Sequence, residues 1–273
     1  MKKCIIIIVA LINLSFLSIA QTTETYWVLH VMGNVITKAT GKSLKVGDKI
    51  TNQDQLKFSD KNASVVVMGP KGKYTLKQNP KASPNEFVAF ANNSLMPMKS
   101  SGHLSSYRQS GPVKASTYFG DKNFNIIGQR IETSINCDHY AFTDQKYLEL
   151  QYRVNGQLQT RKLIPENNKI IVDRSKHFTA PNNQPYDMNK VDSVKIFLVD
   201  LTNNTREIET TFKLNFIDEK KLKDNLIIQK NIYKEMGKTD QEIESELVGF
   251  VNSIYDKTDQ RFLKSWIKSS VMP

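Results

Sequence analysis

The sequence predicts a mostly β protein with a C-terminal α segment: a small β-rich module, an immunoglobulin-like β-sandwich and about three short helices. Three observations predict this order. Short β-branched and aromatic runs alternate with turn signals over residues 26–77. Alternating apolar and polar positions return over residues 124–218. Over residues 219–273 the hydrophobic period changes from 2 to 3.6, which is typical of amphipathic helices.

The composition supports a folded chain of this size. Its 273 residues are 39% hydrophobic and 24% charged, which is too apolar for a disordered protein and long enough for one large or two modest domains. Two cysteines cannot form a disulfide scaffold, so the stability must come from hydrophobic cores.

Residues 1–20 have the features of a secretory signal peptide. Lys2 and Lys3 precede an apolar run, residues 5–17, that is short for a membrane span, and small residues occupy Ser18 and Ala20. We expect cleavage after Ala20 and export to the periplasm, the cell surface or the medium. A retained N-terminal anchor is the alternative.

Cleavage changes the charge and the cysteine count. Without Lys2 and Lys3 the formal charge falls from +11 to +9, and without Cys4 a single cysteine, Cys137, remains. Since Cys4 precedes the apolar run, it is not placed for lipoprotein processing. No later stretch is apolar for long enough to span a bilayer, so no transmembrane segment is expected in the mature chain.

Residues 21–77 form the predicted β-rich module. Glycines, Asp48 and alternating apolar positions recur in the order Gly33-Asn34-Val35, then residues 44–50, 54–58, 63–67 and 72–76. This order resembles the FecR-type periplasmic β-rich domain. The resemblance implies an extracytoplasmic β module used for interaction, whereas the signal relay of that family is not implied, because it needs a membrane segment and a cytoplasmic part.

Residues 78–117 are predicted to connect the two β units. Four prolines interrupt this stretch, and two apolar pieces, residues 87–91 and 95–98, are too short to fold alone but could dock on a sheet.

Residues 118–218 are predicted to form the sandwich. Its clearest element is a hairpin in which residues 147–154 alternate, Asn155-Gly156 suits a type I′ turn, and residues 157–164 return. Neither a cysteine pair nor a core tryptophan supports a true immunoglobulin pattern.

Residues 219–273 are predicted to form the helical tail. Gly237 is suited to end the first helix, and Thr239 with Glu242 forms a capping box for the second. The third carries Phe262, Trp266 and Ile267, which are candidate binding residues or, alternatively, plain core. The tail either packs on the sandwich or binds a partner.

Cys137 and His139 are the candidate catalytic residues. On a strand they would share a face and could form a thiolate–imidazole pair, with His103 and His177 as further metal ligands. The alternative is a buried structural cysteine beside an exposed histidine. Because no nucleotide-binding, serine-hydrolase or metalloprotease motif occurs, neither a metal nor another cofactor is expected.

The basic charge does not predict a nucleic-acid partner. Lysines are scattered along the chain, and the tightest group, Lys220, Lys221 and Lys223, falls at a helix start. Export would also separate the protein from intracellular nucleic acid. An anionic envelope polymer, or solubility alone, better explains diffuse positive charge.

The sequence therefore favours an exported, non-enzymatic interaction or structural protein of the cell envelope. It would act through a β-strand edge or the helical tail, with an envelope protein or an anionic envelope polymer as partner. One alternative is an envelope-polymer hydrolase that uses Cys137 and His139. The other is a periplasmic sensor of a small ligand, which would need a deep apolar pocket between the two β units.

Overall fold

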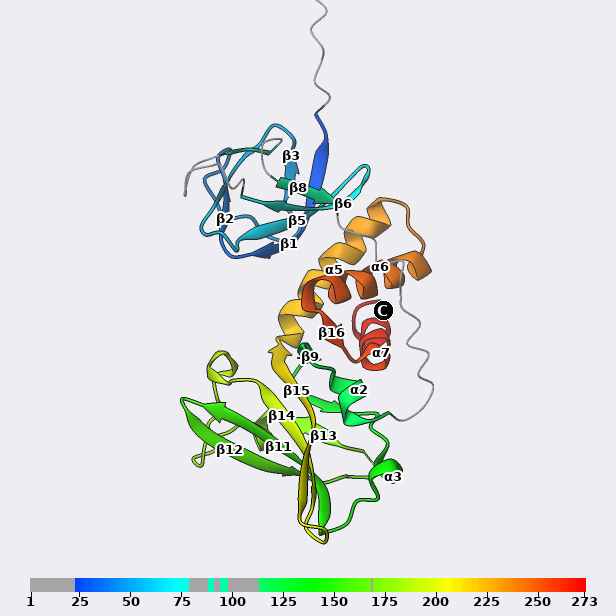
Figure 1. Cartoon of the computed structure of the whole chain (residues 1–273). Coiled ribbons are helices and arrows are strands. Elements are labelled where there is room, and N and C mark those ends of the chain that lie inside the picture. The colour runs from blue at the N-terminus through cyan, green and yellow to red at the C-terminus, as the bar shows by residue number, and fades with distance from the viewer. Residues whose placement is uncertain (1–22, 79–87, 91–93, 98–112, 168) are drawn as a thin grey trace, which may run out of the picture. The chain divides into compact units, whose positions relative to one another are not determined.

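The computed structural model describes residues 23–78, 88–90, 94–97, 113–167 and 169–273 (Figure 1). The predicted leader, with its cleavage point after Ala20, and most of the predicted connecting segment lie outside these residues. The chain divides into two compact units, residues 1–98 and 99–273, and the division falls within the segment 78–117.

Two antiparallel sheets build the N-terminal unit. One has the strand order β3-β1-β5-β6-β8 and the other β2-β4-β7. Every residue of the central strand β5 is buried, in keeping with its run of three valines. The strands are β1 (Thr25–Met32), β2 (Val35–Thr37), β3 (Lys49–Thr51), β4 (Gln55–Phe58), β5 (Ser64–Gly69), β6 (Gly72–Lys77), β7 (Val88–Ala89) and β8 (Ser94–Pro97).

The N-terminal unit extends beyond the predicted boundary at residue 77. β7 pairs with β4 and β8 with β6, so both short apolar pieces of the connecting segment dock on sheet edges. Phe90 is buried, with its ring centroid 4.7 Å from that of Tyr26. A Cβ at Gly69 would come within 2.4 Å of the Tyr26 ring, so this position requires glycine.

A six-stranded sheet dominates the C-terminal unit, in the order β12-β11-β14-β15-β9-β16. β11, β12, β14 and β15 pair antiparallel, whereas β9 lies parallel to both β15 and β16, a pairing that the sequence did not predict. A two-stranded ladder, β10-β13, packs into the same core. The strands are β9 (Asn123–Ile127), β10 (Arg130–Glu132), β11 (Lys146–Val154), β12 (Gln157–Leu163), β13 (Ile171–Asp173), β14 (Val194–Asp200), β15 (Thr205–Ile217) and β16 (Lys257–Thr258).

The predicted hairpin joins β11 to β12. Val154 pairs with Gln157, and the two turn residues Asn155 and Gly156 have φ angles of 50° and 79°. Positive φ at both central positions is the type I′ geometry, so this prediction is confirmed.

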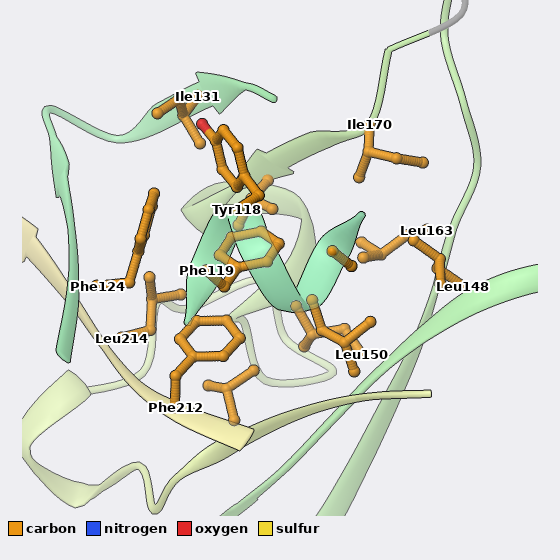
Figure 2. Close-up of a cluster of buried hydrophobic side chains, with 14 of the residues drawn as sticks. Tyr118, Phe119, Phe124, Ile131, Leu148, Leu150, Leu163, Ile170, Phe212 and Leu214 are labelled. Atoms are coloured by element: carbon orange, nitrogen blue, oxygen red, sulfur yellow. The ribbon is translucent and has the colours of Figure 1, made fainter. Parts of the chain in front are cut away.

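An aromatic cluster forms the centre of this core. α2 (Ala115–Phe119) inserts Phe119, whose ring stacks on Phe212 at 4.6 Å and meets Phe124 edge-on at 5.0 Å (Figure 2). Ala115 is also fully buried, so the core begins inside the predicted connecting segment. The other short helices of this part are α3 (Cys137–Tyr140), α4 (Arg174–His177) and the 3₁₀ helix η2 (Met188–Lys190).

Three longer helices follow the sheet, as the sequence predicted. They are α5 (Glu219–Glu235), α6 (Asp240–Tyr255) and α7 (Gln260–Ser270). Thr239 and Glu242 form the predicted capping box, and Gly237 has a φ of 77°. In the described part of the chain, none of the helices is both long enough and apolar enough to cross a membrane.

The helical tail belongs to the same compact unit as the sheet. β16, between α6 and α7, pairs with β9. The Tyr118 hydroxyl donates a hydrogen bond to Asp259 Oδ2 at 2.6 Å, and Lys257 Nζ donates to the Thr117 carbonyl at 2.8 Å. The tail therefore packs on the β part of its own chain.

Candidate functional site

Cys137 and His139 do not form a nucleophile–base pair. They lie on helix α3, not on a strand, because Asn136 caps a helical turn and accepts a hydrogen bond from the His139 N–H. Cys137 is 6% exposed and its Sγ lies 3.7 Å from the Ile135 carbonyl, whereas His139 is exposed. Burial, followed by the charge of Asp138, raises the pKa of the thiol, which disfavours the thiolate.

His177 is held in a local turn and not in a metal site. Its Nδ1 accepts a hydrogen bond from the Asp173 N–H at 3.0 Å, at the start of α4. His103 lies outside the described residues. Among the residues that the structure does describe, no three His, Cys, Asp or Glu side chains come together in a way that could hold a metal ion.

Partial burial of His177 predicts a pH dependence of stability. Burial lowers its pKa, against the opposing effect of Asp173, so the unfolded chain binds a proton more readily than the folded one. Its contribution to the stability of the C-terminal unit is therefore present above the unfolded pKa of about 6.5 and is lost as the pH falls through the folded value. We expect H177N, whose Oδ1 can take the place of Nδ1 as acceptor for the Asp173 N–H, to flatten the loss of stability in urea unfolding between pH 7 and pH 5. An unchanged pH profile in H177N would assign the effect to other groups.

The three candidate binding residues of α7 are separated by the packing. Trp266 is 6% and Ile267 0% exposed, and Trp266 Nε1 donates to Glu219 Oε1 at 2.7 Å. Of the two alternatives for these residues, Trp266 and Ile267 follow the second and are core residues, because the apolar side of α7 faces the other helices. Phe262 alone of the three is exposed, at 37%.

Phe262 lines a groove between β10 and the start of α7, the β10–α7 groove, with a volume of about 810 Å³. Its charged residues are largely paired with one another. Lys169 Nζ lies 2.8 Å from Glu132 Oε2, and Arg130 is 3.5 Å from the same carboxylate. Asp259, the remaining acid, caps α7 and accepts the Tyr118 hydroxyl. This groove therefore offers one exposed ring and little net charge.

A more strongly charged surface covers the outer face of the six-stranded sheet. Along β11, the residues between the buried Leu148, Leu150 and Tyr152 have side chains that point away from the core. Strand register extends this face from β11 to β12, β14 and β15. Five basic residues lie on it: Arg153, Lys162, Lys195, Arg206 and Lys213. We call these five residues, with the strands that carry them, the cationic sheet face.

Glu149 is the one acid that the described register places on this face of the four strands. Arg206 neutralises it, since its Nε and Nη2 lie 3.1 and 2.5 Å from Glu149 Oε1. Arg153, Lys162, Lys195 and Lys213 then leave a surplus of positive charge. The four strands span roughly 15 Å at the usual strand spacing, so these charges can act together on one extended ligand.

Aromatic rings hold two of the cations in place. The Arg206 guanidinium carbon lies 3.5 Å from the centroid of Phe197, which is buried beneath it on β14. Lys162 Nζ lies 4.0 Å from the centroid of Tyr147. Each contact fixes a long side chain that would otherwise sample many rotamers. For Arg206 this supports the pair with Glu149, and for Lys162, one of the surplus cations, it lowers the entropic cost of binding an anion.

Sequence reasoning missed this face because it searched for charges that are close together along the chain. The five basic residues are spread from position 153 to position 213, and pairing between strands brings them together. The alternation of side chains along a strand could have predicted part of this face. Arg153 lies on the side of the predicted strand 147–154 that is opposite its apolar residues, and Lys162 lies on the predicted return strand.

Comparisons with protein-family models, curated proteins and solved structures found no match to this chain. The resemblance of residues 26–77 to the FecR-type domain accordingly stays a prediction. Function is therefore inferred from the surfaces themselves.

Proposed function

We propose that this is an exported, non-enzymatic protein of the cell envelope that binds an anionic envelope polymer through the cationic sheet face. One observation carries the proposal: five basic residues share the outer face of β11, β12, β14 and β15, and the single acid among them is paired with Arg206.

A polymer fits this surface better than a small ligand does. The cations are distributed over four strands, and the described hollows lie elsewhere, at β10, α5 and α2. Each exposed ion pair contributes little, but a chain with repeated carboxylates or phosphates engages several at once and gains from multivalency. Leu158 and Ile208, both exposed on the same face, add apolar contact with the ligand backbone.

The predicted leader supports an envelope ligand over nucleic acid. A chain exported after cleavage at Ala20 meets polysaccharides and other anionic polymers of the envelope, and not the intracellular nucleic acids. The burial of Cys137, while His139 on the same helical turn is exposed, supports a binding role over the hydrolase alternative.

Charge reversal on the face tests the proposal. The variant K195E/K213E alters two basic residues that take part in neither ring contact, and we expect it to weaken binding to polygalacturonate, a carboxylated polysaccharide, by about tenfold or more at low salt. The matched control is K221E/K223E, which makes the same charge change within the tightest lysine group of the sequence, on α5.

Affinity is measured by titration calorimetry at low and physiological ionic strength, with urea unfolding to show that both variants fold. Equal weakening in the two variants would reduce the effect to net charge and contradict a specific face. Tighter binding of duplex DNA than of polygalacturonate, lost in K195E/K213E, would reassign the face to nucleic acid.

A further inference from the structure

We propose that two copies of this chain pair antiparallel along β12, with the two-fold axis at Thr160, so that the six-stranded sheet continues into its copy. The starting observation is an open edge. In the part of the chain that the structure describes, β12 forms a ladder with β11 alone and so ends the sheet order on that side (Figure 1).

The turn of the hairpin decides which backbone groups face outward. Val154 and Gln157 flank a two-residue turn and therefore form a hydrogen-bonded pair, and such pairs alternate along an antiparallel ladder. Gln159 and Arg161 then also bond to β11. The N–H and C=O groups of Leu158, Thr160 and Lys162 point away from it, toward the open edge. The Thr160 carbonyl accepts a hydrogen bond from Arg161 Nη1 at 2.9 Å and keeps its second lone pair for a partner strand.

A neighbouring contact agrees with this assignment. Arg153, the partner of Leu158, belongs to a non-hydrogen-bonded pair, so its carbonyl must point away from β12. It accepts a hydrogen bond from the Asp192 N–H at 2.9 Å, on the β14 side of β11. The same alternation therefore frees the carbonyl of Leu158 for a partner.

Thr160 is the midpoint of β12 and gives the longest symmetric overlap. In this register Thr160 faces its own copy, Lys162 faces Leu158 and Arg161 faces Gln159, so no like charges are directly opposed. A centre shifted to Arg161 would oppose two guanidinium groups. Basic residues on an edge strand usually discourage pairing, and here they disfavour the registers centred at Arg161 and Lys162, whereas the length of the overlap favours Thr160.

The pairing has a consequence for the outer surface. A two-fold axis at Thr160 between antiparallel edge strands is perpendicular to the sheet, so both outer faces lie on the same side. The dimer would place two cationic sheet faces next to each other. The pairing itself depends on β12 and not on polymer binding, so either proposal can fail without the other.

Two substitutions at Leu158 test the register. Leu158 is half-exposed, so neither variant removes core packing. L158K opposes Lys162 of the copy and is expected to weaken dimerisation by about tenfold, whereas L158E creates two ion pairs and is expected to strengthen it at low salt and to lose that gain at high salt. Sedimentation equilibrium of the purified protein over a range of concentrations, without polymer, measures both.

T160P tests the backbone contacts. Proline at this position removes an outward N–H that β11 does not use, and edge strands tolerate such a proline. We expect T160P to be monomeric with its unfolding transition retained, and T160V, which keeps the N–H, to remain dimeric. A wild-type protein that stays monomeric at every concentration, or a dimer that persists in both L158K and T160P, would overturn the proposal.

Discussion

Replacing Phe119 by alanine is expected to lower the free energy of unfolding of the C-terminal unit by about 3–5 kcal/mol. Phe119 is almost fully buried, stacks on Phe212 with an interplanar angle of 8° and meets Tyr118 and Phe124 edge-on (Figure 2). Removal of the ring would leave a cavity between α2 and the sheet that rigid aromatic neighbours cannot close. Such a loss is a large share of the roughly 5–15 kcal/mol that stabilises a typical domain.

Urea unfolding followed by tryptophan fluorescence measures this effect. The chain has two tryptophans, Trp27 in β1 and Trp266 in α7, so W27F leaves a signal from the C-terminal unit alone. F119L, which keeps part of the volume, is expected to cost about 1–2 kcal/mol. As a control, F58A removes a core ring of the N-terminal unit and should leave the Trp266 transition in place. A loss below about 1 kcal/mol in F119A would show that the core repacks around the missing ring.

Replacing Asp259 by alanine is expected to cost the same unit about 2–4 kcal/mol, because one carboxylate has two structural roles. Oδ1 accepts the Phe262 N–H and caps α7. Oδ2 accepts the hydroxyl of Tyr118, a buried residue of α2 whose pKa is raised by burial and then by the Asp259 charge. D259A therefore removes a helix cap and leaves a buried hydroxyl without its acceptor.

A double-mutant cycle separates the two roles. D259S keeps a capping oxygen and is expected to recover about 1 kcal/mol of the loss. Y118F removes the hydroxyl, so combining it with D259A should cost less than the sum of the single changes, by about 1 kcal/mol or more. Additive losses in the Y118F/D259A protein would show that the hydroxyl contact contributes nothing to stability.

Elements whose cause is local were predictable from the sequence. Asn155-Gly156 has the backbone freedom that a type I′ turn requires, and Thr239 with Glu242 satisfies the free N–H groups at the start of α6. In both cases neighbouring residues supply the whole interaction, so no knowledge of the rest of the fold is needed.

Features that depend on residues far away along the chain were not predictable from the sequence. The parallel pairing of β9 depends on β15 and β16, which are far along the chain. On a strand Cys137 and His139 would share a face, but the Asn136 cap and the burial of Tyr140 favour one helical turn. The sequence leaves Trp266 as either a binding residue or core, and the choice depends on Glu219, on another helix, which accepts its N–H.

The candidate site shows the same limit. Each basic residue of the cationic sheet face looks like an isolated surface charge in the sequence, and Arg206 and Lys213, of opposite parity in β15, share a face because β14 and β15 pair with a bulge between Ile196 and Phe197. The pairing register of the strands is therefore needed to predict the cationic sheet face, and the positions of the charges along the chain are not enough.

The position of β9 also decides when the C-terminal unit can fold. β9 is synthesised early, but its neighbours in the sheet, β15 and β16, come from the two ends of the α5–α6 region. β9 can pair on one side once β15 has been made, but its other side stays unpaired until β16, after α6, and contacts of such large sequence separation slow folding. The side of the sheet at β9 is therefore the last part of the ladder to close, and it closes only when the segment between α6 and α7 arrives.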